Sequence, residues 1–127
     1  MKRRITPCPC GGADYAACCG RYHDGGIAPD AEALMRSRYS AYVLKLEAYL
    51  LATWHPDTRP DDLALAEDHT KWLGLSILKH HSESDEQSTV EFVARFKISG
   101  RAAKMHEISR FLRIDGRWHY LDGEFPQ

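Results

Sequence analysis

The fold is decided by residues 89–122, which read TVEFVARFKISGRAAKMHEISRFLRIDGRWHYLD. With the stretch before them, they form four segments of strand character: Trp72–His81, Thr89–Ser99, Ala103–Ile114 and Arg117–Asp122. The joints between these segments are short and polar, and Asp115-Gly116 is typical of a type I′ hairpin turn. Gly100-Arg101 and Ser84-Asp85-Glu86 are the other two joints. Short turns between successive strands predict an antiparallel meander.

Upstream of the strands the pattern is helical. Asp30 is suited to be an N-cap, and apolar residues then recur at helical spacing, which predicts a helix over residues 30–46. A second helix is predicted over 47–53, because Pro56 disfavours helical backbone just before it. A third is predicted from Pro60 to Asp68, with proline at its first position. Helices followed by strands predict an α+β domain, with three helices packed on one face of a curved sheet.

The bulk composition limits the chain to one ordinary globular core. It has 127 residues, of which 43% are hydrophobic and 28% charged. The net charge is −1 and the basic residues are dispersed, so binding to nucleic acid or to an anionic membrane surface is not expected. No stretch approaches the ~20 apolar residues that span a bilayer, and no apolar signal core is present, so we expect a cytoplasmic protein.

All the cysteines lie near the N-terminus, as two close pairs: Cys8-Pro9-Cys10 and Cys18-Cys19. Two such pairs separated by a short loop supply the tetrahedral sulfur ligands that zinc prefers, and four thiolates leave no open position for catalysis. The sequence therefore predicts a structural zinc site, with His23 as a spare ligand. Unliganded thiols or disulfides are the alternative, and a redox pair is disfavoured because neither pair has Cys-x-x-Cys spacing.

Cys8-Pro9-Cys10-Gly11 followed by Cys18-Cys19-Gly20 resembles the SEC-C zinc motif, known from the C-terminal tail of the SecA protein-export ATPase. Further blocks, in order along the chain, are similar to the YchJ family of small bacterial proteins: Ala28–Asp30, Leu34–Tyr39, Thr53–Pro56, Trp72–Leu75, Phe92–Phe96, Ser109–Phe111 and Trp118–Gly123. The resemblance implies a SEC-C-like zinc segment over 1–28 and a nuclear transport factor two-like cone over 29–127. The loop over 11–17 is shorter than in the usual motif and has no lysine, so the chaperone docking of the SecA tail is not implied.

Cone folds often enclose a cavity, and the hairpin registers indicate which side chains would line it. A loop at Gly100-Arg101 places Glu91 opposite Arg110, and a loop one residue longer places Arg95 opposite Glu107. The Asp115-Gly116 turn places Arg113 opposite Trp118, Phe111 opposite Tyr120 and Ser109 opposite Asp122. The candidate pocket residues are Arg38, Tyr42, Trp54, His55, Trp72, Glu91, Arg95, Glu107, Arg110, Trp118, Tyr120 and Asp122.

Simpler roles compete with several of these assignments. Cross-strand ion pairs often decorate a solvated face, and His55 at a helix end often bonds to backbone. Arg36 and Arg38 lie on different sides of the first helix, and we expect one of them to reach an acidic partner or an anionic ligand. The opposite sheet face, with Ile108, Leu112 and Leu121, is too apolar to be left in water, so a second copy of the chain or the N-terminal segment is expected to cover it.

Two functions are consistent with these patterns. The first is a zinc-stabilised binding or adaptor module, with a small ligand in the cavity and a protein partner at the zinc segment. The second is a small isomerase- or hydrolase-like enzyme that uses His55 or Asp122 as base and Arg95 or Arg110 as electrostatic stabiliser. No complete catalytic set can be assembled from spacing, which favours the first.

Overall fold

The computed structural model describes residues 5–126. Residues 1–4 and 127, which are the outer ends of the predicted units 1–28 and 29–127, lie outside the described residues. The division at 28/29 stays a prediction. None of the helices in the described range has the length and apolar character needed to cross a membrane.

Two of the three predicted helices are confirmed, as α2 (Ala31–Leu44) and α3 (Glu47–Ala52). The Asp30 side chain accepts a hydrogen bond from the Ala33 backbone N–H at 2.8 Å, so it is the N-cap that the sequence indicates. The predicted helix over 60–68 is wrong, because only the short 3-10 turn η2 (Leu65–Glu67) forms there. Tertiary packing overrides helix propensity: Ala64 takes a left-handed backbone, and buried Leu65 packs with Leu50 of α3.

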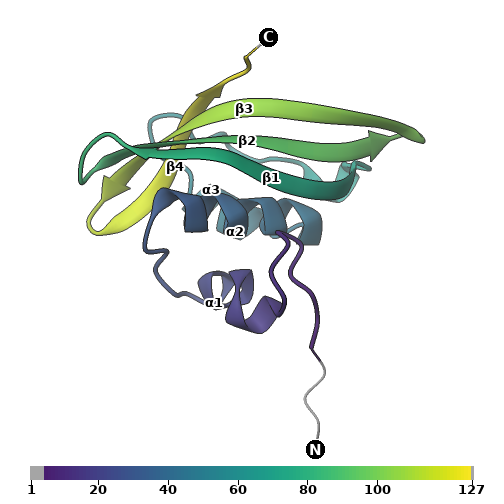
Figure 1. Ribbon diagram of the computed structural model, residues 1–127, viewed down its shortest axis with the longest axis horizontal. Helices are drawn as coiled ribbons and strands as arrows, with labels where there is room; N and C mark the ends of the chain where they lie inside the picture. The colour runs from purple at the N-terminus through teal and green to yellow at the C-terminus, as the bar shows by residue number, and fades with distance from the viewer. Residues whose placement is uncertain (1–4, 127) are drawn as a thin grey trace, which may run out of the picture.

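The four predicted strands are confirmed as one antiparallel sheet in the order β1-β2-β3-β4. Their bounds are Lys71–Ser82, Gln87–Ile98, Arg101–Ile114 and Arg117–Glu124. The sheet lies over α2 and α3, and none of the helices in residues 5–126 covers its other face (Figure 1). On that outer face Ile108, Leu112 and Leu121 are half-buried. Residues 5–28, called the N-terminal segment below, lie on the far side of α2 from the sheet and do not cover this outer face (Figure 1).

The predicted register between β2 and β3 is wrong in both of its versions. The turn is Ser99-Gly100, so Ile98 pairs with Arg101. Both turn residues have positive φ, at 51° and 79°, which is the backbone of a type I′ turn. In consequence Glu91 lies opposite Ile108 and Arg95 opposite Lys104, and neither predicted ion pair forms.

The β3–β4 hairpin follows the prediction only as far as a bulge. Arg113 pairs with Trp118 and Phe111 with Tyr120, as predicted from the Asp115-Gly116 turn. The register then shifts between Arg110 and Phe111, so that Asp122 lies opposite Arg110 and Gly123 opposite Ser109. A bulge adds one residue to one strand, which moves the following side chains to the other face. Asp122 therefore leaves the inner face, and Gly123 takes its place.

The N-terminal segment is partly helical. It forms the 3-10 turn η1 (Tyr15–Ala17) and the helix α1 (Cys19–His23). Cys8, Cys19 and Tyr22 of this segment are buried and belong to the same core cluster as side chains of α2 and the sheet. The central helix α2 therefore packs on both sides, with the sheet on one and the N-terminal segment on the other (Figure 1).

Candidate functional site

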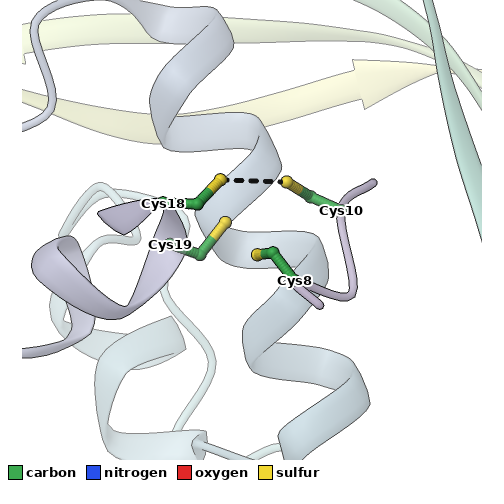
Figure 2. A group of neighbouring side chains, drawn as sticks. All are labelled: Cys8, Cys10, Cys18 and Cys19. Atoms are coloured by element: carbon green, nitrogen blue, oxygen red, sulfur yellow. Dashed lines mark hydrogen bonds between the residues drawn. The ribbon is translucent and has the colours of Figure 1, made fainter. Parts of the chain in front are cut away.

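The four cysteines converge at one point beside α2. Their sulfur atoms all lie within 4.8 Å of one another, and the described residues contain all four as free thiols (Figure 2). Cys8 and Cys10 come from the N-terminal loop, whereas Cys18 and Cys19 come from the start of α1. Four thiolates around one tetrahedral ion, each at ~2.3 Å, would lie roughly 3.8 Å apart. The chemistry and spacing of the donors therefore fit a closed site for one metal ion.

A tight turn brings the first cysteine pair to the cluster. The Cys8 N–H donates to the Gly12 carbonyl at 2.9 Å, and the Gly11 N–H donates to the Cys8 carbonyl at 3.0 Å. Gly12 passes so close to the second pair that a Cβ there would lie 2.7 Å from the Cys18 sulfur. Only glycine fits at this position, because any side chain would push the sulfur out of the cluster.

The thiols of the cluster perturb one another. A hydrogen bond from Cys19 lowers the pKa of the Cys10 thiol to about 4, despite its burial. The same bond and burial raise the pKa of Cys19, and burial and the bond to Cys10 raise that of Cys18 to about 11. One thiolate is thus held by neighbouring thiols. A cation at the centre would stabilise the other thiolates as well, since metal binding and thiol deprotonation are linked.

His23 has a different role from the spare ligand that the sequence suggests. Its Nε2 lies 2.8 Å from the Ser37 carbonyl, which can only accept, so Nε2 is the donor. Its Nδ1 then accepts from the Tyr15 hydroxyl at 2.6 Å. Both ring nitrogens are therefore occupied, and His23 fastens the cysteine segment to α2.

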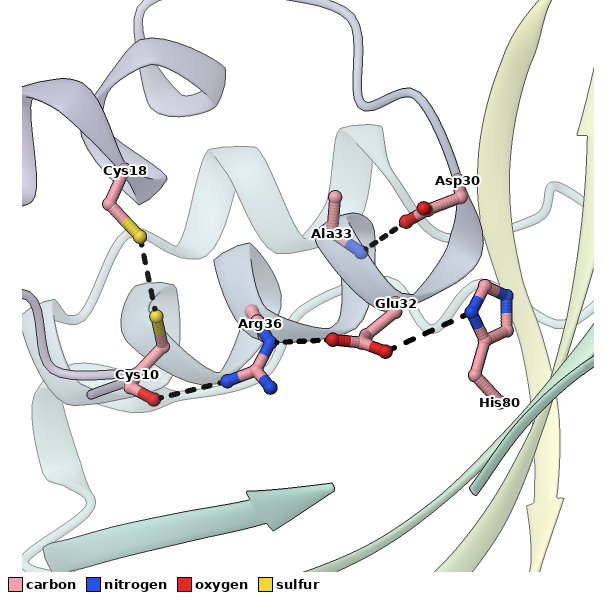
Figure 3. Close-up of polar contacts among 7 residues, drawn as sticks. All are labelled: Cys10, Cys18, Asp30, Glu32, Ala33, Arg36 and His80. Atoms are coloured by element: carbon pink, nitrogen blue, oxygen red, sulfur yellow. Dashed lines mark hydrogen bonds and ion pairs between the residues drawn. The ribbon is translucent and has the colours of Figure 1, made fainter. Parts of the chain in front are cut away.

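A chain of polar contacts joins the cysteine segment to the sheet across α2 (Figure 3). The Arg36 side chain donates to the Cys10 carbonyl at 3.4 Å and to the Glu32 carboxylate at 3.0 Å. The other Glu32 oxygen lies 3.8 Å from His80 Nδ1 of β1. Arg36 thus places a positive charge beside the thiolate cluster, which supports four negatively charged sulfur ligands.

The opposite side of α2 faces a cavity of about 260 Å³ under the sheet. Its walls are largely aromatic, with a few polar groups. The lining residues are Met35, Arg38, Tyr39, Tyr42, Trp54, Trp72, Phe92, Ala94, Met105, Glu107, Ser109 and Tyr120.

Arg38 is the buried cation of this cavity, with 3% of its surface exposed. Its Nη1 donates to the Leu50 carbonyl at 2.8 Å and to the Thr53 hydroxyl at 2.7 Å. The guanidinium lies over two rings, 5.0 Å from the centre of Trp54 and 4.8 Å from that of Tyr120. Burial lowers the pKa of Arg38, and no carboxylate of residues 5–126 forms an ion pair with it.

Glu107 is the buried carboxylate of the cavity, and one of its oxygens already accepts two hydrogen bonds. One oxygen accepts from the Ser109 hydroxyl and, at 3.2 Å, from the Tyr120 hydroxyl. Burial and the nearby Glu107 carboxylate raise the pKa of Tyr120, so the phenol stays protonated as a donor. A Cβ at Gly123 would lie 2.3 Å from the carboxylate. The bulge that brings Gly123 onto the inner face therefore makes room for Glu107.

Half of the predicted pocket residues line this cavity: Arg38, Tyr42, Trp54, Trp72, Glu107 and Tyr120. Trp118 and His55 lie elsewhere. Trp118 is core and borders a second cavity of about 220 Å³ beside the N-terminal segment. His55 follows α3, donates its backbone N–H to the Tyr120 carbonyl and accepts at Nδ1 from the Asp57 N–H.

The other four predicted pocket residues belong to the outer sheet face. The Glu91 carboxylate lies 2.6 Å from His106 Nε2. Arg110 forms a bidentate ion pair with Asp122, with N–O distances of 2.6 and 2.5 Å. Arg95 is exposed, opposite Lys104. The register shifts explain two of these positions. The predicted pairing with Glu107 would have turned Arg95 inward, and the predicted pairing with Ser109 would have turned Asp122 inward.

Sequence reasoning missed five lining residues: Met35, Tyr39, Phe92, Ala94 and Met105. Ser109, which the Asp115-Gly116 turn places opposite Asp122, also lines the cavity. The lining residues on α2 could have been predicted from their helical spacing. Met35, Tyr39 and Tyr42 recur with Arg38 at the spacing of one helix face. The strand residues depend on the β2–β3 register, which the sequence left open.

Comparison with known proteins agrees with this architecture. A UPF0225 protein from Chromobacterium violaceum is 59% identical, with 96% of this chain and 95% of that protein aligned. A UPF0225 protein from Bordetella pertussis is 54% identical, over 92% of this chain and 91% of its own length.

Two solved structures share the fold. The solution structure of a SEC-C motif-containing protein from Rhodopseudomonas palustris has a TM-score of 0.81 at 36% identity, covering 96% of this chain and all of that one. The crystal structure of a SEC-C motif-containing protein from Psychrobacter arcticus has a TM-score of 0.80 at 31% identity, covering 97% of this chain and 84% of that one. These two proteins share the helix-on-sheet fold, and both are described as containing a SEC-C motif.

The match to a family covers most of the chain. Residues 30–123 match the family described as "YchJ, middle NTF2-like domain", which confirms the fold that the sequence blocks imply. The cysteine cluster precedes this region, as the resemblance to the SEC-C motif predicts. The chain therefore belongs to the YchJ-like, UPF0225 family, with an NTF2-like domain behind an N-terminal cluster of four cysteines that could hold a metal ion.

Proposed function

We propose that the protein is a zinc-stabilised binding module whose NTF2-like cavity takes a small ligand. The observation that carries the ligand half is the cavity at Arg38, a buried cation that forms no ion pair with any carboxylate of residues 5–126, including Glu107 in the same wall. Such a cation costs free energy unless something else in the site compensates it. A bound ligand would supply the compensation.

The zinc half rests on the donor set. Four cysteine sulfurs within 4.8 Å match the Cys₄ class of structural zinc site, which leaves no open position for substrate. Zinc bound there would join the loop that carries Cys8 and Cys10 to α1. Metal analysis of freshly purified protein, together with thiol titration, tests this half: one zinc per chain and protected thiols are expected. Four freely reacting thiols without stoichiometric metal would contradict it.

Binding is favoured over catalysis by the contents of the cavity. His55, Arg95, Arg110 and Asp122, which the enzyme hypothesis uses, do not line it. Glu107 does line it, with one oxygen accepting from two hydroxyl groups, but among residues 5–126 no histidine or second carboxylate lines the cavity to complete a catalytic set with it. A general base must reach the proton that it abstracts.

The ligand half is tested by native mass spectrometry of the protein isolated from its own host under non-denaturing conditions. We expect a bound small molecule that is released on unfolding. Its absence, together with no binding by any member of a small-molecule panel in ligand-observed NMR, would overturn this half of the proposal.

The remaining predictions concern the cellular compartment of the protein and its partners. The four free cysteines suit a reducing compartment, so we propose the cytoplasm. A protein partner at the zinc segment and a second copy of the chain on the outer sheet face also stay predictions. Light scattering of the purified protein tests the second, since a monomer at high concentration would contradict it.

A further inference from the structure

We infer that the cavity selects a small carboxylate attached to a flat apolar body, such as an aromatic acid, and that Arg38 recognises the carboxylate. This inference rests on the proposed function, because it names the class of ligand for the same cavity. It is carried by the donors that remain free, by the charge of the site and by the shape of its walls.

The guanidinium has donors left over for a ligand. Among residues 5–126, the hydrogen bonds of good geometry from Arg38 are the two made by Nη1, to Leu50 and Thr53. Nε and Nη2 make none within this range, and the Tyr42 hydroxyl also interacts with the guanidinium. The only fully enclosed side-chain nitrogen or oxygen without a partner in that range is Nε1 of Trp54. The two remaining Arg38 nitrogens are therefore not sealed off. They form an edge of the guanidinium suited to a carboxylate, which binds it through two parallel bonds.

The polar balance of the cavity favours an acceptor over a donor. The indole N–H of Trp54 also has no partner among residues 5–126, but it is fully enclosed and does not face the ligand. Glu107 is the only acidic side chain of the wall, and its hydroxyl donors come from the protein itself. A ligand therefore meets the Arg38 guanidinium, whose positive charge makes an anion the better match.

The rest of the wall defines the body of the ligand. Tyr39, Tyr42, Trp72 and Phe92 offer aromatic surfaces, and Met35 and Met105 add adaptable apolar ones. The volume of about 260 Å³ lies below the ~300–1,000 Å³ of sites for drug-sized ligands. A molecule with one aromatic ring, or two fused rings, fits these limits better than a long chain or a nucleotide.

The test compares ligands of one shape and different charge on the unmodified, metal-loaded protein. Benzoate, benzamide and benzylamine are titrated by NMR, with inorganic phosphate at matched ionic strength. We expect benzoate to bind roughly tenfold or more tightly than benzamide, because charge-assisted bonds are about twice as strong as neutral ones. Benzylamine and phosphate should bind more weakly still.

Variants locate the recognition at Arg38. Arg38→Lys keeps the charge but loses the forked geometry, and Arg38→Met removes both, so benzoate affinity should fall in that order. Arg110→Met removes a positive charge from the outer sheet face and should leave affinity unchanged. If both Arg38 variants unfold, the ligand series on the unmodified protein still decides the question.

The outcomes separate the inference from the proposed function. Benzamide binding as tightly as benzoate would overturn the anionic ligand but leave a binding cavity. Phosphate binding as tightly as benzoate would overturn the aromatic body. Binding of none of the probes, with no molecule retained from the host, would overturn the inference and the ligand half of the proposed function together.

Discussion

The N-terminal segment, residues 5–28, and the sheet, residues 71–124, pack on opposite sides of α2 but are held there in different ways. The sheet buries large apolar side chains, including Val90, Phe92 and Phe111, all at most 3% exposed. The N-terminal segment buries cysteines and Tyr22, and it is fastened by polar contacts through His23 and Arg36. A short segment cannot bury enough apolar surface to offset its ordering entropy, so a metal ion is the natural supplement.

Removing the metal should separate the two regions most clearly. Structural zinc in small peptides contributes on the order of 10 kcal/mol, so chelation should remove the structure of the segment carrying Cys8 and Cys19. The sheet has its own apolar core and should keep its protection. Hydrogen exchange followed residue by residue measures both regions in one experiment.

Adding zinc back after chelation is the control, and it should restore the segment. Simultaneous loss of protection in β2 and β3 would show that the two regions unfold as one unit. In that case the predicted boundary at residues 28/29 would be wrong.

The two regions also differ in how far the sequence determines them. The cysteine cluster could be predicted because ligand type and spacing act locally, and the strands because turn signals such as Asp115-Gly116 separate them. The third helix could not be excluded, because the left-handed Ala64 depends on where Leu65 packs. Local propensity does not contain that information.

The cavity was predictable only in part, for a related reason. A one-residue change in the β2–β3 turn or a bulge in β4 turns side chains to the other face. The sequence does not specify either, so Asp122 was expected inside, whereas Gly123 lies opposite Ser109 there. Arg38 and Tyr42 were found because helical spacing carries no such ambiguity.

On the sheet side, Gly123→Ala should have the next largest effect. The new methyl group would collide with the Glu107 carboxylate, and overpacking of this kind typically costs about 1–3 kcal/mol. The measurement is urea unfolding, with NMR of the Tyr120 ring to follow the displaced carboxylate. Gly74→Ala is the matched control, since a Cβ there meets no atom within 4 Å. Equal stability of the two variants would show that Glu107 is not held in place by Gly123.

Disrupting the polar contact that links the two regions should have a smaller effect than metal removal or Gly123→Ala. Arg36→Gln removes a cation that bonds the Cys10 carbonyl beside the cluster, and loss of such an outer contact typically lowers metal affinity by about 10–100-fold. Competition with a chelator of known affinity measures the change, and we expect the lower end because Arg36 is partly exposed. Arg59→Gln makes the same substitution away from the cluster and serves as control. Unchanged zinc affinity in Arg36→Gln would confine its role to the bond with Glu32.

The smallest effect is expected on the outer sheet face, at the pair of Arg110 and Asp122. The two side chains are 56% and 44% exposed, so their ion pair should contribute less than ~1 kcal/mol. Arg110 lowers the pKa of Asp122 below its ordinary value of 3.8, so the folded state binds the proton less readily than the unfolded state. The contribution is therefore complete above about pH 4 and is lost as the pH falls through the lowered pKa. Unfolding of the wild type and of Asp122→Asn should differ slightly at pH 7, and this difference should shrink toward pH 3. A difference that persists unchanged at pH 3 would mean that Asp122 stabilises the bulge by its shape and not by its charge.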